Sequence, residues 1–492
     1  MLSQRVIDQN PWWADAAAIA SDRDLVALSR QTLRFEPPIP VALDRDAIYG
    51  LRGPRQVGKT TLLKRVASHL LDRLRVPPRA LLYLDVERAG LLDYPALSAT
   101  LEAYLTWARP SLAATPGARL FLLLDEVTAV PRWSTALKAV HAAGGLDGAT
   151  VIATGSDVLD LERGVDRLPG RRGSAAHPDW ILMPWSFHDF VAVHDAGLAA
   201  RLPVIPLGDP HQAYAAAQEI ALHGTALQAL FTRFLQTGGF PHAVHSEAEV
   251  GRVEPHVHQL HEAAILGEVH RAGRDESRVR EVVRLVATKH LGREFSWHGL
   301  AADTSIGSHT TARDYVEDLE RTFVWHLWHR VKSRESAAEA LRSPKKLYPV
   351  DPLTWHVIEG WATGVVDRWA ATLRMVADPQ RAGYLVESVL ASLLRRRFGH
   401  FAFYQRDRKG ASEVDFVAFR DTRLAAVIEV KWTARVAPRD VPFLVRAGGG
   451  IVASQAELAW WPEQKVAVIP AAFLAAGFGP GHTLFPASGA AP

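Results

Sequence analysis

The sequence predicts a multidomain α/β protein whose first large domain contains a parallel sheet. The chain has 492 residues, more than one hydrophobic core usually serves, so about three domains are expected. Its hydrophobic fraction of 48% and charged fraction of 22% are typical of a soluble globular protein. Strand-length apolar runs near 81–86, 120–124 and 151–153 have helical patterns between them. This alternation favours a parallel sheet covered by helices.

The composition argues against several classes of protein. No apolar run approaches the roughly 20 residues of a membrane span, so no membrane segment is expected. The N-terminus lacks a basic start followed by an apolar stretch, so no signal peptide is expected. The chain contains no cysteine, which fits a cytoplasmic location and excludes disulfides, thiolate zinc sites and a cysteine nucleophile. The net charge of +3 is too small to indicate nucleic-acid binding by itself.

A glycine-bounded loop stands between an apolar strand and an amphipathic helix in AIYGLRGPRQVGKTTLLKRVASHLL. Residues 53–60 form a complete G-x-x-x-x-G-K-T, a phosphate-binding motif in the context it requires. The loop N–H groups and the helix N-terminus would cradle phosphates. Lys59 would neutralise the β- and γ-phosphates, and Thr60 would hold Mg²⁺. The predicted nucleotide-binding residues are Gly53, Pro54, Arg55, Gln56, Val57, Gly58, Lys59, Thr60 and Thr61. The alternative is a glycine-rich turn with a chance lysine.

Two later strands end in polar residues. ARLFLLLDEV ends in Asp125 and Glu126, and a carboxylate at the tip of a parallel strand faces the phosphate crevice. We expect Asp125 to bind Mg²⁺ and Glu126 to activate the attacking water, which predicts hydrolysis and not binding alone. In ATVIATGSDV, Thr154 and Ser156 are predicted to sense the γ-phosphate. For Asp125 and Glu126, the alternative is a pair of solvated acids at a strand end.

The stretch LPGRRGS follows this strand. Arg171 or Arg172 could reach a transferring phosphate, in cis or across a subunit boundary, and Arg171 is taken as the catalytic candidate. The alternative is a solvated turn.

These stretches resemble the AAA-type P-loop ATPases of bacteria and archaea that end in a domain of unknown function with restriction-endonuclease-like features. The resemblance covers nearly the whole chain and implies an ATPase core near Asp46 to Leu202, followed by a helical segment. The stretches that carry it are NPWW (Asn10–Trp13), YGLRGPRQVGKTT, LLLDEV, TGS, LPGRRG, MPWSFHDF, TGGFP (Thr237–Pro241) and KKLYPVDP.

The middle of the chain reads mainly as helices. In HVHQLHE, His258, His261 and Glu262 share one helical face, for which a solvated face is expected over a metal site. Further on, FSWHGLAADTSIGSHTTARDYVEDLERTFVWHLW has the pattern of a winged helix-turn-helix with Ser308 capping the second helix. If this segment binds DNA, the head of its recognition helix is His309, Thr310, Thr311 and Arg313. The alternative is a lid or protein-contact module.

The C-terminal region reads as a helix, three strands, a helix and a strand, which resembles the PD-(D/E)xK nuclease core. The strand period of two puts Glu429 and Lys431 on one face, toward Asp415 on the preceding strand. Asp415 and Glu429 are predicted to bind Mg²⁺, Lys431 to orient water or stabilise developing charge, and Glu387 to support the metal from the preceding helix. The proline of the family name is absent, because Val414 precedes Asp415. A charged hairpin, or a non-cleaving protein with this fold, is the alternative.

The sequence therefore predicts an ATP-hydrolysing protein, with ATP and Mg²⁺ as cofactors, that couples nucleotide turnover to a nucleic-acid-handling module with nuclease chemistry. The alternative is a non-cleaving ATP-dependent switch or remodelling scaffold that binds DNA or protein. DNA or RNA are candidate partners, and a homo-oligomer is a candidate assembly. The expected segments are an N-terminal arm 1–45, a P-loop ATPase core 46–202, a helical lid 203–291, a winged helix-turn-helix 292–345 and an α/β nuclease-like domain 346–492.

Overall fold

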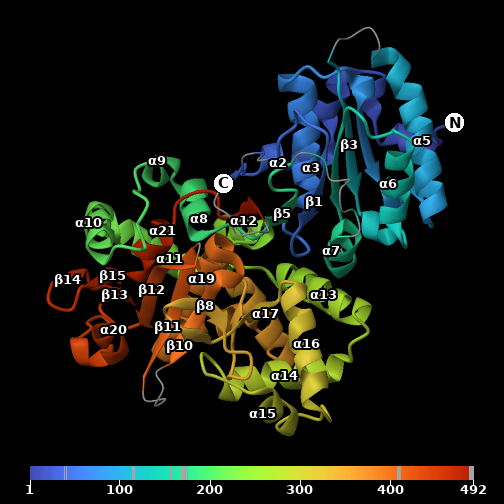
Figure 1. The fold of residues 1–492 in the computed structure, drawn as a ribbon. Helices are drawn as coiled ribbons and strands as arrows, with labels where there is room; N and C mark the ends of the chain where they lie inside the picture. Colours follow the sequence, from blue (N-terminus) through green and yellow to red (C-terminus); the bar gives the residue numbers. More distant parts are fainter. Residues whose placement is uncertain are drawn as a thin grey trace. The chain divides into compact units, whose positions relative to one another are not determined.

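The chain divides into two compact units, drawn in Figure 1. The computed structural model describes all residues except 38, 40, 113–116, 156–157, 167, 169–172, 174, 407–411, 421 and 487–492. Apart from the last residues of the chain, unit 1 comprises Met1–Leu182 and unit 2 comprises Met183–Phe485. The division falls inside the segment 46–202 predicted as ATPase core, and the predicted domain boundaries stay predictions.

Unit 1 is built on a parallel sheet. The strands lie in the order β5-β1-β4-β3-β2, and each neighbouring pair is parallel. Strand β3 is buried along its whole length, which explains its continuous apolar sequence, because both faces of a parallel sheet are covered by helices. The parallel sheet predicted from the sequence is confirmed. The strands are β1 (Ala47–Arg52), β2 (Leu81–Asp85), β3 (Leu120–Asp125), β4 (Ala149–Thr154) and β5 (Asp179–Leu182).

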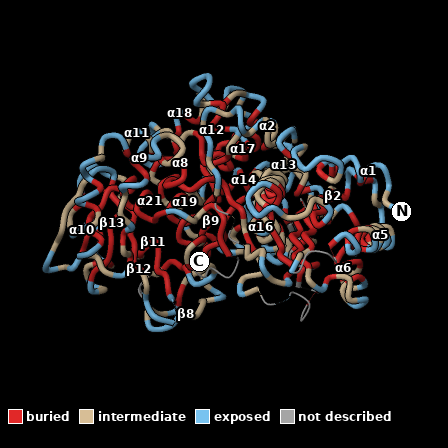
Figure 2. The backbone as a smooth tube through the Cα atoms, turned by 90° about the horizontal axis from the view of Figure 1, so that it is seen from above, coloured by how far each residue is buried: buried red, intermediate tan, exposed pale blue. Residues whose placement is uncertain are grey.

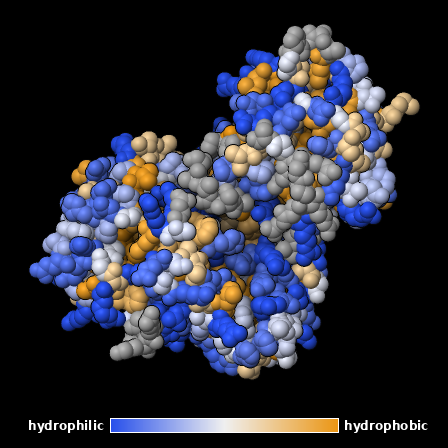
Figure 3. Space-filling model, viewed as in Figure 1, coloured by the Kyte–Doolittle hydropathy of each residue, from blue (hydrophilic) through white to orange (hydrophobic). Residues whose placement is uncertain are grey.

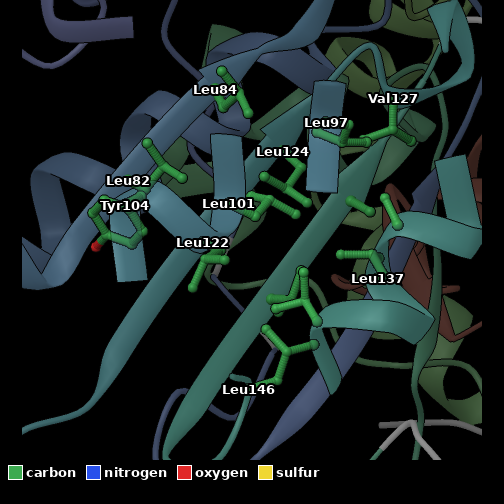
Figure 4. Packing of buried hydrophobic residues seen from close by; sticks show 14 of the residues in the cluster. Leu82, Leu84, Leu97, Leu101, Tyr104, Leu122, Leu124, Val127, Leu137 and Leu146 are labelled. Carbon is green, nitrogen blue, oxygen red and sulfur yellow. The ribbon is translucent and has the colours of Figure 1, made fainter. Parts of the chain in front are cut away.

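Helices pack on this sheet through leucine-rich faces. Leu97, Leu101 and Tyr104 of α5 lie against Leu82 and Leu122 of the sheet in one buried cluster (Figure 4). Burying a leucine side chain contributes about 2 kcal/mol, so this face of the sheet is a main source of the stability of unit 1. The α-helices of unit 1 are α1 (Gln4–Asp8), α2 (Arg23–Arg30), α3 (Lys59–Ser68), α4 (Val86–Ala89), α5 (Tyr94–Leu112), α6 (Trp133–Ala142) and α7 (Val158–Asp166). Short 3-10 or π turns cover Pro11–Trp13, Ala16–Ser21, His69–Arg73, Pro78–Ala80 and Val127–Ala129.

Unit 2 begins with a run of helices, as the sequence pattern predicts. These are α8 (Phe187–His194), α9 (Ala196–Ala199), α10 (Pro210–Ala221), α11 (Gly224–Thr237), α12 (Pro241–Val250), α13 (Pro255–Arg271) and α14 (Glu276–Lys289). Helix α8 starts with a capping box, in which the Ser186 hydroxyl accepts the Asp189 N–H and the Asp189 carboxylate accepts the Ser186 N–H. The motif MPWSFHDF therefore marks a helix start.

A short helix pair and two small antiparallel strand pairs follow. Helix α15 (Trp297–Ala302) packs against α16 (His309–Arg321), whose N-cap Ser308 accepts the Thr311 N–H. Strands β6 (Trp325–Trp328) and β9 (Lys346–Pro349) form one antiparallel pair, and β7 (Val331–Ser333) and β8 (Ser336–Glu339) form another. The elements occur in the predicted order, and the winged helix-turn-helix stays a prediction.

The last part of unit 2 is a mixed sheet with covering helices. Its strand order is β10-β11-β12-β13-β15-β14, with β10 to β12 antiparallel and β12, β13 and β15 parallel. Figure 2 shows β11, β13 and α19 largely in the colour of buried residues. The strands are β10 (Ala402–Arg406), β11 (Glu413–Arg420), β12 (Arg423–Lys431), β13 (Gly450–Ser454), β14 (Ala459–Trp461) and β15 (Val466–Pro470). Strand β16 (Leu484–Pro486), near the chain end, is not part of this sheet. The helices are α17 (Pro352–Thr363), α18 (Arg368–Ala377), α19 (Pro379–Phe398), α20 (Pro442–Arg446) and α21 (Ala471–Ala476), with 3-10 turns at Gly399–Phe401 and Pro438–Asp440.

The face of the molecule in Figure 3 is predominantly polar. On the face shown in Figure 3, hydrophilic side chains cover most of the surface and hydrophobic ones form small separate groups. No helix among the described residues has both the length and the apolar content needed to cross a membrane.

Candidate functional site

The predicted phosphate-binding loop turns tightly between β1 and α3. Gly53 has a φ of 153°, and a Cβ there would lie 2.0 Å from the carbonyl oxygen of Leu182, so only glycine fits. Gly58 has a φ of 102°, and a Cβ there would meet nothing within 4 Å. Its backbone therefore faces open space at the start of α3, where a helix N-terminus attracts a phosphate.

Lys59 lies folded over this loop. Its buried ammonium Nζ donates to the carbonyl oxygens of Gly53 and Pro54, both at 3.0 Å. The charge is thus held beside the loop N–H groups, where phosphate oxygens would compete with the two carbonyls. The other predicted residues of the loop and helix start are Arg55, Gln56, Val57 and Thr61, of which Val57 is buried and Gln56 is exposed.

Asp125 lies at the tip of β3 and is nearly enclosed, with 2% of its surface exposed. The Tyr83 hydroxyl donates to its Oδ2 at 2.9 Å, the Glu126 N–H donates to its Oδ1 at 3.1 Å, and the Thr60 hydroxyl also bonds its carboxylate. Burial raises the pKa of Asp125 to about 6, against the hydrogen bonds from Thr60 and Tyr83. Thr60 and Asp125 thus bring together oxygen ligands of the kind that Mg²⁺ prefers, and they fit this ion.

Two more predicted residues lie at the same end of the sheet. Glu126 follows Asp125 with a φ of 52°, a left-handed conformation that costs about 1–3 kcal/mol and is common at functional sites. Thr154 ends β4 opposite Leu51 of β1 and is fully buried, and its hydroxyl has no hydrogen-bond partner among the described residues. Ser156, Arg171 and Arg172 lie outside the described residues, so their roles stay predictions.

A second group of charged residues converges in unit 2. The Asp415 N–H donates to Glu429 Oε2 at 3.3 Å, and the Val430 N–H donates to Asp415 Oδ2 at 2.9 Å. Their side chains therefore share one face of the β11–β12 pair, as the strand period predicts. Both are buried, with exposed fractions of 6% and 5%. The arrangement is not that of a hairpin with charges scattered over both faces.

Two lysines neutralise part of this group. Lys431 Nζ lies 2.7 Å from Glu429 Oε1. Lys346, on β9, lies 2.8 Å from Glu413 Oε1 and 3.3 Å from Asp415 Oδ1, and its side chain is 1% exposed. Burial alone would lower the pKa of Lys346, but the surrounding acids and Tyr348 outweigh it and raise that pKa well above its ordinary value. Lys346 is thus a permanent cation of the group.

Glu387 completes the group from helix α19. The Tyr348 hydroxyl donates to its Oε2 at 2.9 Å, and the charge of Asp415 acts on it. Burial, and then the Asp415 charge, raise the pKa values of both Glu387 and Glu429, and the nearby lysines lower them, so these two carboxyl groups hold their protons more tightly than exposed ones. Among the described residues, no three histidine or acidic side chains have the geometry of a metal site, and the oxygen ligands that suit Mg²⁺ are those of Asp415 and Glu429.

Arg313, near the exposed head of α16, is paired with acidic residues of the same helix. Arg313 Nη2 lies 3.1 Å from Asp314 Oδ1, and Arg313 Nε lies 3.6 Å from Glu317 Oε1. Helix α16 carries four acidic residues and two arginines. Its charge therefore opposes phosphate contacts, and DNA binding by His309, Thr310, Thr311 and Arg313 stays a prediction.

The histidines of α13 are placed differently from the expectation. His258 and His261 are buried, with exposed fractions of 2% and 4%, so the solvated face expected for them is wrong. Both nitrogens of His258 and Nε2 of His261 have no hydrogen-bond partner among the described residues. The face of α13 that carries these histidines packs against α12, α14, α17 and α18, and the Phe240 ring lies 4.5 Å from that of His261, which explains the difference.

Three segments of the chain match known family models. Residues 45–191 match the family described as an AAA domain. Residues 228–361 and 382–459 match two families described as domains of unknown function, DUF8612 and DUF4143. No curated protein matches the chain.

Three solved structures show weak similarity. The crystal structure of Cdc6p from Pyrobaculum aerophilum has 13% identity and a TM-score of 0.22, over 74% of this chain and 96% of that one. Thermotoga maritima RuvB T158V has 16% identity and a TM-score of 0.22, over 67% and 90%. C. elegans PCH-2 has 15% identity and a TM-score of 0.21, over 46% and 63%. These TM-scores are too low to support an inference about fold or function.

Unit 1 therefore contains a P-loop domain of the AAA type, as the parallel sheet, the glycine-bounded loop and the family match agree. The predicted P-loop class is confirmed.

Sequence reasoning missed Tyr83, Lys346, Tyr348 and Glu413. Glu413 shares the strand period with Asp415, which is a signal that could have identified it. Lys346 and Tyr348 lie in the quoted stretch KKLYPVDP, but nothing local assigns their side chains to Asp415 and Glu387.

Proposed function

We propose that unit 1 hydrolyses ATP. The observation that carries this proposal is the position of Asp125 beside Thr60 and the Lys59 loop, at one end of the parallel sheet. Thr60 and Asp125 would hold Mg²⁺, which when bound neutralises phosphate charge. Lys59 binds the β- and γ-phosphates, Glu126 takes the proton of the attacking water, and Thr154 contacts the γ-phosphate. Arg171 is the proposed arginine that stabilises the transferring phosphoryl group.

Two variants test this proposal. Lys59→Ala should abolish tight binding of Mg-ATP, whereas Glu126→Gln should retain binding and lose hydrolysis, because the two residues bind phosphate and activate water respectively. The exposed Glu102→Gln on α5 is the matched control and should keep full turnover. Binding is measured with a fluorescent ATP analogue and turnover by phosphate release. Turnover that is unchanged in both variants would refute the ATPase proposal.

We propose further that unit 2 is a nucleic-acid-handling module with a nuclease-type centre. Its support is the convergence of Asp415, Glu429 and Lys431 on one sheet face. Asp415 and Glu429 would hold Mg²⁺, which when bound polarises a phosphodiester. Lys431 orients the attacking water or stabilises the charge that develops on the phosphate, and Glu387 supports the carboxylates from α19.

One observation favours a second candidate, a non-cleaving switch or scaffold. Lys346 and Lys431 already pair with the acids of the group, so the charges have a structural use without a reaction. Incubation of the full chain with mixed DNA and RNA, with and without ATP and Mg²⁺, separates the two candidates. Cleavage that is lost in Lys431→Ala supports the nuclease, and DNA-stimulated ATP turnover without cleavage supports the switch. A cytoplasmic location and homo-oligomerisation belong to both proposals.

A further inference from the structure

The N-terminal arm lies along the free edge of the parallel sheet. Strand β2 is the last strand of the order in unit 1, and an edge strand presents alternate N–H and C=O groups outward. The amide of Asn10 donates to the Tyr83 carbonyl at 2.8 Å and accepts the Tyr83 N–H at 2.7 Å. The amide of Gln9 makes the same pair of bonds to Asp85, at 3.2 and 2.7 Å.

These amides imitate a neighbouring strand, and the two tryptophans that follow extend the pairing. The indole N–H groups of Trp12 and Trp13 both donate to the Leu81 carbonyl, at 3.2 and 2.8 Å. Asn10 is 1% exposed, so its bonds are shielded from water and worth more than exposed ones. The motif QNPWW therefore fixes β2 along its length.

A second part of the arm contacts helix α3, which follows the phosphate-binding loop, close to Tyr83. Lys64 of α3 lies 3.0 Å from Asp22 and 2.5 Å from Asp24 in the arm. Its Nζ also lies over the ring of Tyr83, 5.7 Å from the centroid. Contacts from both parts of the arm thus converge on Tyr83.

Tyr83 connects the arm to the predicted nucleotide site. Its hydroxyl donates to Asp125 Oδ2 at 2.9 Å, while the Glu126 N–H donates to Oδ1. Tyr83 is 5% exposed. Burial and then the Asp125 charge raise its pKa, so the hydroxyl keeps the proton that it donates. Three groups set the direction of the Asp125 carboxylate: the backbone N–H of Glu126 on Oδ1, the Tyr83 hydroxyl on Oδ2, and the Thr60 hydroxyl.

We propose that Tyr83 is a positioning residue for Asp125, and that the N-terminal arm, through Asn10, holds Tyr83 in place. This inference rests on the proposed ATPase function, in which Asp125 binds Mg²⁺. The arm then contributes to nucleotide binding. Without the arm, strand β2 and its Tyr83 would no longer be held in the position that orients the Asp125 carboxylate.

The test is a double-mutant cycle in the full chain, read by equilibrium binding of a fluorescent ATP analogue in EDTA and in Mg²⁺. Tyr83→Phe should weaken binding about tenfold in Mg²⁺, the usual effect of one lost hydrogen bond to a charged group. It should leave binding in EDTA unchanged, because Lys59 and the loop are untouched. Asn10→Ala should weaken binding in Mg²⁺ by a smaller factor, and should add nothing in the Tyr83→Phe background.

Trp13→Phe is the matched control. It removes an edge bond to Leu81 but none to Tyr83, so it should lower the unfolding temperature without changing the Mg²⁺ dependence of binding. The inference is overturned if Tyr83→Phe binds like the wild type in Mg²⁺, or if Asn10→Ala weakens binding equally with and without the Tyr83 hydroxyl. If Asn10→Ala does not fold, the comparison of Tyr83→Phe with Trp13→Phe still decides the role of Tyr83. A wild type that binds no nucleotide in either buffer would instead refute the proposed ATPase.

Discussion

The buried histidines of α13 predict that unit 2 loses stability in mild acid. Burial lowers the pKa of His258 from 6.5 to about 4 and that of His261 to about 3. In the unfolded chain both become protonated as the pH falls through about 6.5, whereas in the folded unit they stay neutral to a much lower pH. Protons therefore favour the unfolded state, and stability is lost as the pH falls from about 6.5 toward 4.

The size of this loss follows from the pKa differences. One pKa unit corresponds to about 1.36 kcal/mol, so at pH 5 each histidine lowers the free energy of unfolding by about 2 kcal/mol, and the two together by about 4 kcal/mol. His258→Met removes one titrating group while filling a similar volume. It should recover about 2 kcal/mol of the difference between pH 7.5 and pH 5.

Urea unfolding at the two pH values measures this difference, and hydrogen exchange of α13 and α17 peptides identifies the transition of unit 2. His256, which is exposed on the same helix, gives the control His256→Met, which should leave the pH dependence unchanged. The reasoning is refuted if His258→Met loses as much stability at pH 5 as the wild type does.

Three further predictions concern the charged groups of unit 2. Asp415→Ala and Lys431→Ala should each abolish Mg²⁺-dependent cleavage of nucleic acid while ATP turnover stays largely intact; equal loss of both activities would argue against two separate sites. Lys346→Met removes a buried positive charge beside Asp415, so Mn²⁺ should bind at least tenfold tighter to nucleotide-free protein, measured by calorimetry. The control, Lys332→Met at an exposed position, should bind Mn²⁺ like the wild type. Weaker Mn²⁺ binding by Lys346→Met would contradict this prediction. If α16 binds duplex DNA, Glu317→Gln should tighten binding at low salt and Arg313→Ala should weaken it; absence of any binding would assign α16 to a protein partner.

The sequence was most informative where a short motif determines its own geometry. The glycine-bounded loop and the strand ending in Asp125 predicted a parallel sheet with its polar tips together, because strand, loop and helix follow each other within a few residues. The period of two placed Glu429 and Lys431 on one face for the same reason, whereas Asp415 meets Glu429 through the pairing of β11 with β12. Both predictions depend only on local spacing.

Contacts between distant parts of the chain could not be predicted in this way. Tyr83 and Asp125 are 42 residues apart, Asn10 and Tyr83 are 73 apart, and Lys346 and Asp415 are 69 apart. Which side chain meets which depends on the order of strands in the sheet, and one sequence does not encode that order locally. The burial of His258 escaped prediction because a histidine on a helix is compatible with either face.

The edge of β2 also bears on how the protein avoids aggregation through this strand. An uncovered edge strand of this apolar sequence, LLYLD, is a template for strand addition between chains and so for aggregation. Gln9, Asn10 and the two tryptophans occupy the outward groups at Leu81, Tyr83 and Asp85, which leaves no row of unpaired groups for another chain to join. A truncation that begins at the sheet, however natural as a domain boundary, would uncover this template and yield a protein that precipitates.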